Sequence, residues 1–305
     1  MAKSKAIDLE LIPEAYRPTQ PLNSEASSKE RNRIYPPAPQ ALPVPVIDNH
    51  THMDFEKSSP IDVEQALGAA ARVGVSGVVQ VGCDVLSSRQ AVQLAETHPQ
   101  VLAAVAIHPN DAARLAERGE LEAALDDIAA LAGHERVRAI GETGLDYFRT
   151  EEPGRPAQEY SFRAHLELAR EHHKAVQIHD RDAHQDVVRV LLDAQRPEKV
   201  VFHCFSGDEE LARLCNEHGW YMSFAGTVSF KNSTDLQAAL RVADPSLILV
   251  ETDAPFLTPH PFRGRPNASY MIPYTVEFMA RERGMDLAEL CHLVAQNTRA
   301  VYGDF

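Results

Sequence analysis

The sequence predicts an α/β protein: a (β/α)8 TIM barrel that follows a proline-rich leader. From residue 46 onward, short apolar runs alternate with longer segments of helical periodicity, a pattern typical of strands joined by crossover helices. The apolar runs are nearly continuous in Val, Ile and Leu, which indicates strands buried on both faces of a parallel sheet. Eight such runs in residues 46–305 suit a barrel of about 250 residues. A doubly wound sheet is the alternative.

Residues 1–45 differ from the rest of the chain and are predicted to form an extended or disordered leader. They contain eight prolines and a polar run at 23–33, and this composition buries too little apolar surface to offset the entropy of ordering. The stretch Pro36-Pro37-Ala38-Pro39 favours polyproline II, and residues 7–12 could dock on the body. We expect a chain that begins near Leu42 to fold and to keep its turnover.

The barrel domain is predicted to span residues 46–305. Its strands are expected at 46–50, 77–81, 101–107, 137–141, 175–178, 200–202, 221–224 and 247–250. Segments whose length and periodicity suit helices lie between them, among them 61–73, 121–131, 158–172 and 186–193. A final helix at 286–302 would close the bottom or the side of the barrel.

Polar side chains of metal-binding type end six of the eight predicted strands. They are His50 and His52, His108, Glu142, His179, His203, and Glu251 with Asp253. His50 and His52 are two residues apart in a strand, so their side chains point the same way, about 6.6 Å apart along it. The carboxyl ends of barrel strands meet on the face where catalysis occurs. A single histidine there could be structural, but together these residues predict a metal site.

Composition narrows the class of protein. A net charge of −14 disfavours nucleic-acid binding over a broad basic surface, although metal ions can set the charge of a local site. No apolar run approaches 18 residues, so no membrane span is expected. The four cysteines lack C-x-x-C spacing and are expected to be reduced thiols in a cytoplasmic protein.

From Val46 to the C-terminus, the sequence resembles the TatD family of metal-dependent hydrolases. The resemblance rests on the blocks Ile47-Asp48-Asn49-His50-Thr51-His52-Met53-Asp54, Gly141-Glu142-Thr143-Gly144-Leu145-Asp146-Tyr147, His203-Cys204-Phe205-Ser206-Gly207 and Glu251-Thr252-Asp253-Ala254-Pro255-Phe256. It implies a TIM barrel with a divalent-metal site and, as in characterised members, deoxyribonuclease activity.

Carried onto this chain, the resemblance implies six metal ligands and two divalent metal ions. The ligands would be His50, His52, Glu142, His179, His203 and Asp253. Glu142 would bridge the two ions, and Asp253 would bind one ion and take the proton from the attacking water. Four histidines suit Zn, Mn, Ni or Fe, whereas Mg prefers oxygen ligands.

Two departures from the family pattern bear on substrate preference. The third-strand block, usually His-Pro-His, reads His108-Pro109-Asn110, and the loop after the eighth strand has Arg263-Gly264-Arg265-Pro266 where the family usually has Arg-Asn-Glu-Pro. His108, Arg263 and Arg265 are predicted to bind substrate phosphate, because guanidinium groups bind it through paired hydrogen bonds.

The predicted function is metal-dependent cleavage of phosphodiester bonds in DNA, in an exonuclease-like manner on single-stranded ends. Two divalent ions, two carboxylates and a hydroxide would give a site of about +1 charge, which attracts an anionic substrate. DNA is the expected partner, with no obligate protein partner and no membrane. One alternative is a barrel hydrolase of esters, amides or lactones. The other is a non-enzymatic binding module that uses the leader as its interaction arm.

Overall fold

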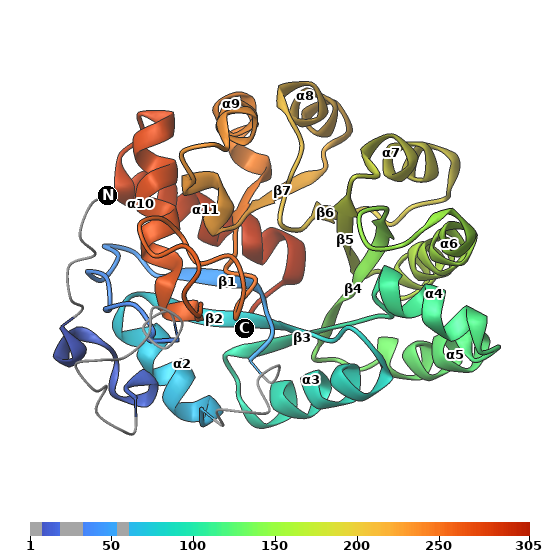
Figure 1. The fold of residues 1–305 in the computed structure, drawn as a ribbon, viewed down its shortest axis with the longest axis horizontal. Helices are drawn as coiled ribbons and strands as arrows, with labels where there is room; N and C mark the ends of the chain where they lie inside the picture. The colour runs from blue at the N-terminus through green and yellow to red at the C-terminus, as the bar shows by residue number, and fades with distance from the viewer. Residues whose placement is uncertain (1–7, 19–32, 54–60) are drawn as a thin grey trace.

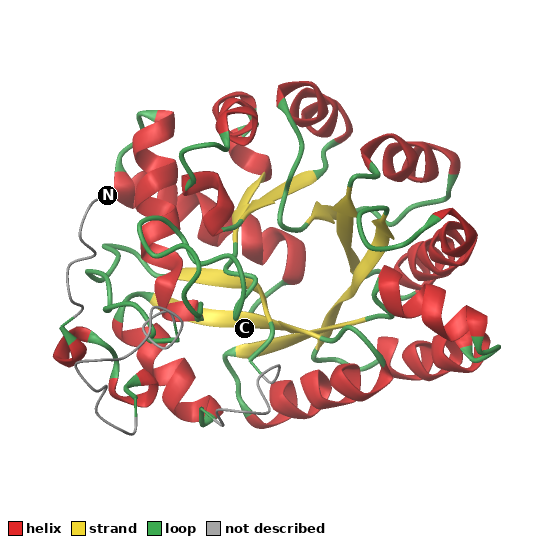
Figure 2. Ribbon diagram, viewed as in Figure 1, coloured by secondary structure: helices red, strands yellow, loops and turns green. Residues whose placement is uncertain are grey.

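The computed structural model describes residues 8–18, 33–53 and 61–305. In Figures 1 and 2 the strands lie at the centre and the helices surround them, which is the arrangement of a TIM barrel. The sheet has eight strands in the order β1-β2-β3-β4-β5-β6-β7-β8, and all neighbouring pairs are parallel. The predicted fold class is therefore confirmed, and the doubly wound alternative is excluded.

The elements alternate through the barrel as predicted. The strands are β1 (Val46–Thr51), β2 (Val75–Val81), β3 (Val101–Val105), β4 (Val137–Asp146), β5 (Ala175–Arg181), β6 (Val200–Phe202), β7 (Tyr221–Phe224) and β8 (Ile248–Val250). The helices are α2 (Val63–Arg72), α3 (Val85–Thr97), α4 (Pro109–Glu117), α5 (Leu121–Ala132), α6 (Arg155–Glu171), α7 (His184–Asp193), α8 (Glu209–His218), α9 (Thr234–Val242), α10 (Ile272–Arg283) and α11 (Leu287–Tyr302). No helix in the described part of the chain is both long and apolar enough to span a bilayer.

The outer helices follow from local sequence. In α8, the Asp208 side chain caps the first turn by accepting the Leu211 amide, and Gly219 ends the helix with φ 68°. Asp is favoured at the start of a helix and Gly at a left-handed end. Leu211, Ala212 and Cys215 are buried on one face of α8. Spacings of three and four residues place these side chains together against the barrel.

The ends of β1 and β8 lie side by side just beyond the last residues of β8. The His52 amide donates to the Ala254 carbonyl (2.9 Å), the Asp253 amide donates to the His50 carbonyl (3.0 Å), and Thr51 bridges to Ala254. The buried Asp48 carboxylate accepts the Thr252 amide and hydroxyl at 2.9 and 2.6 Å. These bonds bring together the predicted ligands His50, His52 and Asp253, which are about 200 positions apart in sequence.

The described parts of the leader pack on the barrel. Ile12 is 1% exposed, and Tyr16, Ile34 and Leu42 are also buried in the main apolar core. The burial of Ile12 agrees with the expected docking of residues 7–12 on the body. The premise of few packed contacts is wrong for Tyr16, Ile34 and Leu42, because these apolar side chains are buried although the sequence around them is polar and rich in proline. Most of the polar run at 23–33, up to residue 32, lies outside the described residues, as does Ile7.

Candidate metal centre

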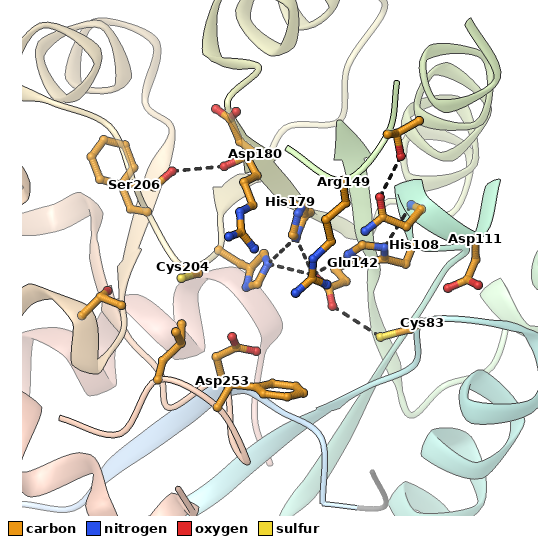
Figure 3. Close-up of a pocket in the computed structure, with 18 of the residues that line it drawn as sticks. Cys83, His108, Asp111, Glu142, Arg149, His179, Asp180, Cys204, Ser206 and Asp253 are labelled. Atoms are coloured by element: carbon orange, nitrogen blue, oxygen red, sulfur yellow. Dashed lines mark hydrogen bonds and ion pairs between the residues drawn. The ribbon is translucent and has the colours of Figure 1, made fainter. Parts of the chain in front are cut away.

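The six predicted ligands lie together at the carboxyl ends of the strands. A cleft of about 1210 Å³ opens there, and its lining includes five of them: His52, Glu142, His179, His203 and Asp253. The sixth, His50, is fully buried beneath the cleft and lies beside His52. Figure 3 shows Glu142 at the centre, with His179 and His108 on one side and Asp253 on the other.

Local backbone geometry in β4 allows Glu142 to reach the centre of the barrel. The register between β4 and β5 shifts between Ile140 and Thr143. At Gly141 the two strands approach so closely that a Cβ would lie 2.4 Å from Cβ of Gln177, so only glycine fits there. Burial would raise the pKa of the Glu142 carboxyl, but the neighbouring His203 and the hydrogen bond from His179 hold it well below its usual range. Glu142 is therefore an ionised carboxylate in a buried place.

The two oxygens of Glu142 face different sets of groups. Oε1 lies 3.5 Å from Nε2 of His52 and 3.9 Å from Nε2 of His50. Asp253 Oδ1 lies at the same two distances, 3.5 and 3.9 Å, from these nitrogens, which are 3.2 Å apart. Ligands about 2.0–2.2 Å from one ion lie roughly 3–4 Å from each other. This first set therefore has the spacing of ligands to a single ion.

A second set lies on the other side of the carboxylate. Oε2 of Glu142 lies 2.8 Å from Nε2 of His203 and 3.1 Å from Nδ1 of His179, and these two nitrogens are 3.4 Å apart. Asp253 contributes to the first set through Oδ1, whereas no described distance places it in the second. One carboxylate thus stands between two clusters of donors.

Each of the four histidines is fixed by an acceptor that lies away from the centre. These are the Gln177 side chain for His50 (3.0 Å), the Val81 carbonyl for His52 (2.9 Å), Asp146 for His179 (3.2 Å) and Glu251 for His203 (3.3 Å). The ring nitrogen that faces an acceptor carries the proton, so the other nitrogen directs a lone pair to the centre. Burial lowers the pKa of His50 well below its usual value, which favours the neutral ring, whereas neighbouring acidic groups raise the pKa of His52, His179 and His203.

This donor set fits divalent metal ions. Lone pairs and carboxylates that converge within 2.8–3.9 Å repel one another unless positive charge lies among them. Neutral imidazoles held by a second layer of acceptors are the usual protein ligands of zinc and similar metals. The sequence could supply the ligand types, but only the structure shows which ring nitrogen each histidine presents.

His108 differs from the other four histidines of the cleft. It caps α4, where its Nδ1 accepts the Asn110 amide at 3.1 Å. The proton of the neutral ring is therefore on Nε2, which lies 3.9 Å from Glu142 Oε2. Burial lowers the pKa of His108 to about 3 and keeps the ring neutral. His108 presents a hydrogen-bond donor to the centre and no lone pair, so it is suited to a substrate oxygen.

Supporting residues that the sequence analysis missed include Gln177, which bonds His50, and also Asp146 and Cys83. Asp146 bonds His179 and also accepts from Asn110 (3.0 Å), the residue that departs from the family pattern. Cys83 lies just after β2 and donates to Glu142 Oε1 at 3.4 Å, and burial raises the pKa of its thiol to about 12. The position of Cys83 after a predicted strand was the available signal, but a lone cysteine is ordinarily inert.

The structure places the predicted substrate arginines elsewhere. Arg265 donates to the Ile34 carbonyl of the leader at 3.2 Å, and Arg263 stacks on Phe230, 4.5 Å from the ring centroid. Neither is among the residues that line the cleft, whereas Arg149 and Arg181 are. The structure therefore does not bring Arg263 and Arg265 into the lining of the cleft, and their binding of substrate phosphate stays a prediction.

A parallel barrel with metal-binding side chains at the carboxyl ends of its strands is the architecture of a barrel metal-dependent hydrolase. The family described as TatD related DNase matches residues 47–303, and the chain belongs to it. The resemblance in the sequence is thereby confirmed. The protein is a metal-dependent hydrolase that acts on ester bonds.

The sequence matches to related proteins cover almost the whole barrel. The chain is 40% identical over 268 residues to a protein of Mycobacterium tuberculosis named uncharacterized metal-dependent hydrolase TatD, covering 85% of this chain and 98% of that protein. It is 35% identical over 259 residues to YabD of Bacillus subtilis, which is named in the same way, covering 84% and 98%. The crystal structure of the TatD homologue YjjV from Escherichia coli superposes with a TM-score of 0.77 at 25% identity, covering 84% of this chain and 97% of that one.

Proposed function

We propose that the protein cleaves phosphodiester bonds in DNA at a centre of two divalent metal ions bridged by Glu142. The observation that carries the proposal is that the two oxygens of the Glu142 carboxylate face different donor sets, Oε1 the first and Oε2 the second. Two adjacent ions can stabilise both the attacking and the leaving oxygen of a phosphodiester. The positive charge of such a centre favours an anionic substrate such as a phosphate ester.

His50, His52 and Asp253 would hold one ion with Oε1 of Glu142, and His179 and His203 would hold the other with Oε2. When bound, the ions would polarise the phosphate and lower the pKa of a water molecule toward about 7. The nitrogen-rich donor set suits Zn, Mn, Ni or Fe better than Mg.

Two residues of the chain would act directly on substrate or water. Asp253 lies at the cleft surface, its side chain 15% exposed, and would accept the proton of the attacking water. The Nε2–H of His108 would donate to a phosphate oxygen and stabilise the charge that develops there. These roles need no movement of either side chain away from the cleft.

Features of the cleft wall support a single-stranded substrate. Arg181 lines the cleft and lies over the ring of Phe148, 4.1 Å from its centroid. Phe256 also lines the cleft and is 44% exposed, although large apolar side chains are usually buried. An exposed aromatic ring can stack on a nucleobase only if that base is unpaired. Guanidinium and aromatic groups beside a phosphate-cleaving centre therefore favour single-stranded ends.

We also place the protein in the cytoplasm. The four cysteines, Cys83, Cys204, Cys215 and Cys291, are free. Unpaired thiols are typical of proteins in a reducing compartment. Fusing a fluorescent protein to the C-terminus and fractionating the cells would test this location.

The assignment is tested by assaying purified protein on single-stranded DNA, double-stranded DNA and RNA, each with Zn²⁺, Mn²⁺, Ni²⁺, Fe²⁺ or Mg²⁺. We expect cleavage of single-stranded DNA to be fastest and to stop when the metal is chelated. Strong ester, amide or lactone hydrolysis without DNA cleavage under any of these conditions would instead assign the protein to the first alternative.

Replacing Arg181 with alanine is expected to raise KM for single-stranded DNA roughly tenfold with little change in kcat, because a charged hydrogen bond to phosphate is lost. The slope of log affinity against log salt, expected near −1 to −2, should become shallower by about 0.7. Arg213→Ala is the matched control, because Arg213 pairs with Glu209 on the exposed surface of α8. Equal effects of the two substitutions would contradict a specific contact at Arg181.

Replacing Phe256 with alanine is expected to raise KM for single-stranded DNA roughly tenfold, because base stacking is worth about 1–3 kcal/mol per base. An oligonucleotide with an abasic end should show little change, since it has no base to stack there. Tyr160→Ala on α6 is the control, because this exposed aromatic is not among the residues that line the cleft. A similar loss with base-bearing and abasic ends would rule out stacking on Phe256.

A further inference from the structure

The two described segments of the leader form one packed unit. The Ala38 amide donates to the Leu11 carbonyl at 2.8 Å and joins residues 33–45 to residues 8–18. Arg17 Nε donates to the Ile12 carbonyl at 2.9 Å within the first segment. The rings of Tyr16 and Tyr35, one from each segment, lie 4.7 Å apart. The leader therefore has internal structure where it meets the barrel.

This unit is attached to the barrel at the end of α2, where the Leu42 amide donates to the Val73 carbonyl (3.0 Å), and at the stretch that follows Asp253. Arg265 donates to the Ile34 carbonyl (3.2 Å), Tyr270 to the Pro36 carbonyl (2.6 Å) and Tyr274 to the Pro37 carbonyl (3.2 Å). The ring of Tyr270 also packs 5.0 Å from that of Tyr16. In Figure 1 the described leader, in blue, lies on the side of the barrel formed by α2 and α10.

The same stretch of chain fixes the backbone around Asp253. Asn267 donates through its side chain to the carbonyls of Thr252 (3.0 Å) and Phe256 (2.6 Å), and through its amide to the carbonyl of Pro255 (3.1 Å). Asp253 itself has φ 52°, in the left-handed region, which costs a non-glycine residue energy and persists only where its surroundings hold it.

The leader also reaches the back of the first donor set. A small cavity of about 50 Å³ is lined by Tyr16 and Tyr35 of the leader together with His52, Ala254 and residues 267–269, among others. A leader side chain is thus one layer away from His52 and from the residue that follows Asp253. Residues that hold metal ligands from behind by hydrogen bonds commonly tune metal affinity by 10- to 100-fold, and the leader would act on such residues through the stretch that contains Asn267.

We infer that the leader is a clamp that positions Asp253 and His52 for metal binding, with Tyr270 as its main attachment. The family match begins at residue 47, so the clamp is an addition to the barrel that the family shares. This inference rests on the proposed ligand roles of Asp253 and His52. It reverses the expectation that the leader is dispensable.

The test uses full-length protein and Zn²⁺ in competition with a chromogenic chelator. Tyr270→Phe removes the hydrogen bond to the Pro36 carbonyl and keeps the ring. We expect it to lower the affinity for one of the two zinc equivalents roughly tenfold. The melting temperature of the metal-free protein should fall by only a few degrees, the effect of losing a single buried hydrogen bond. Tyr16→Ala changes the leader instead of the barrel and should lower the affinity for the same zinc equivalent. Tyr160→Phe, an exposed tyrosine on α6, is the matched control and should change neither quantity.

A double-mutant cycle separates positioning from general destabilisation. In an Asp253→Ala background, adding Tyr270→Phe should cause no further loss of zinc affinity, because the two residues act on the same equivalent. Three results would overturn the clamp. The tyrosine variants could lower the affinity for both zinc equivalents equally, or neither variant could lower it at all. Tyr270→Phe could also lower zinc affinity as much in the Asp253→Ala background as in the unmodified protein. Absence of zinc binding by the unmodified protein would overturn the proposed metal centre itself.

Discussion

Replacing Glu142 with glutamine is expected to lower kcat for DNA cleavage by about three orders of magnitude or more. The substitution keeps the shape of the side chain but removes its charge and turns one oxygen into an NH₂ group. That group would face one of the two donor sets, either His50 and His52 or His179 and His203, and would disfavour a cation there. A loss of several kcal/mol of charge stabilisation corresponds to a rate loss of this size.

The measurement for Glu142 is kcat together with the number of metal ions bound per chain. We expect the glutamine variant to bind one ion fewer than the unmodified protein, or to bind both far more weakly. Glu117→Gln is the matched control, because Glu117 is an exposed acid that lines the same cleft. A Glu142→Gln variant with normal turnover and full metal content would contradict the bridging role.

The barrel and the gathering of its six candidate metal ligands could be predicted from the sequence because both follow from short-range rules. Buried parallel strands are continuous apolar runs, and a polar residue that ends such a run must lie at the carboxyl face of the barrel. His179 and His203 satisfy this rule. His203 follows the apolar run 200–202, and His179 follows the buried run 175–178. This rule does not depend on separation in sequence, so residues at the ends of β1 and β8 could be predicted to lie at one site.

The direction in which each group points could not be predicted. The separation of the Glu142 oxygens depends on the register shift at Gly141, and hydrophobic periodicity does not encode such a shift. The protonated nitrogen of His108 depends on a local helix cap, in which Nδ1 accepts the Asn110 amide, and the residue pattern does not decide which ring nitrogen makes that bond. Arg265 lies on a loop, where a flexible side chain is directed by its partners, and its partner Ile34 is 231 residues away in sequence.

The leader shows a different limit of sequence analysis. Its average composition is that of a disordered segment, yet stability depends on individual burials: Ile12 and Tyr16 bury almost all of their surface against the barrel. Burying a large apolar side chain is worth about 1.5–3 kcal/mol, so a few such residues can anchor a polar chain. Composition averaged over 45 residues conceals an anchor that occupies only a few positions.

Replacing Asp253 with asparagine is expected to lower kcat by about 10²- to 10⁴-fold, the usual contribution of a general base. Asparagine retains an oxygen at the place where Asp253 Oδ1 faces His52, so metal binding should weaken only modestly. It cannot accept a proton from water, however, and KM for DNA should stay nearly constant. Asp111→Asn is the control, because Asp111 also lines the cleft but pairs with Arg114.

Excess metal distinguishes the two roles proposed for Asp253. If the carboxylate acts as both ligand and base, saturating Zn²⁺ or Mn²⁺ should restore the metal content of the Asp253→Asn variant but leave its turnover low. Recovery of normal turnover at high metal concentration would show that the residue serves only as a ligand. The proton of the attacking water would then have to pass to another group in the cleft. Glu142 and the four converging histidines would be engaged with metal, and His108 carries a proton on the nitrogen that faces the centre, so Asp253 is the acceptor that the geometry favours.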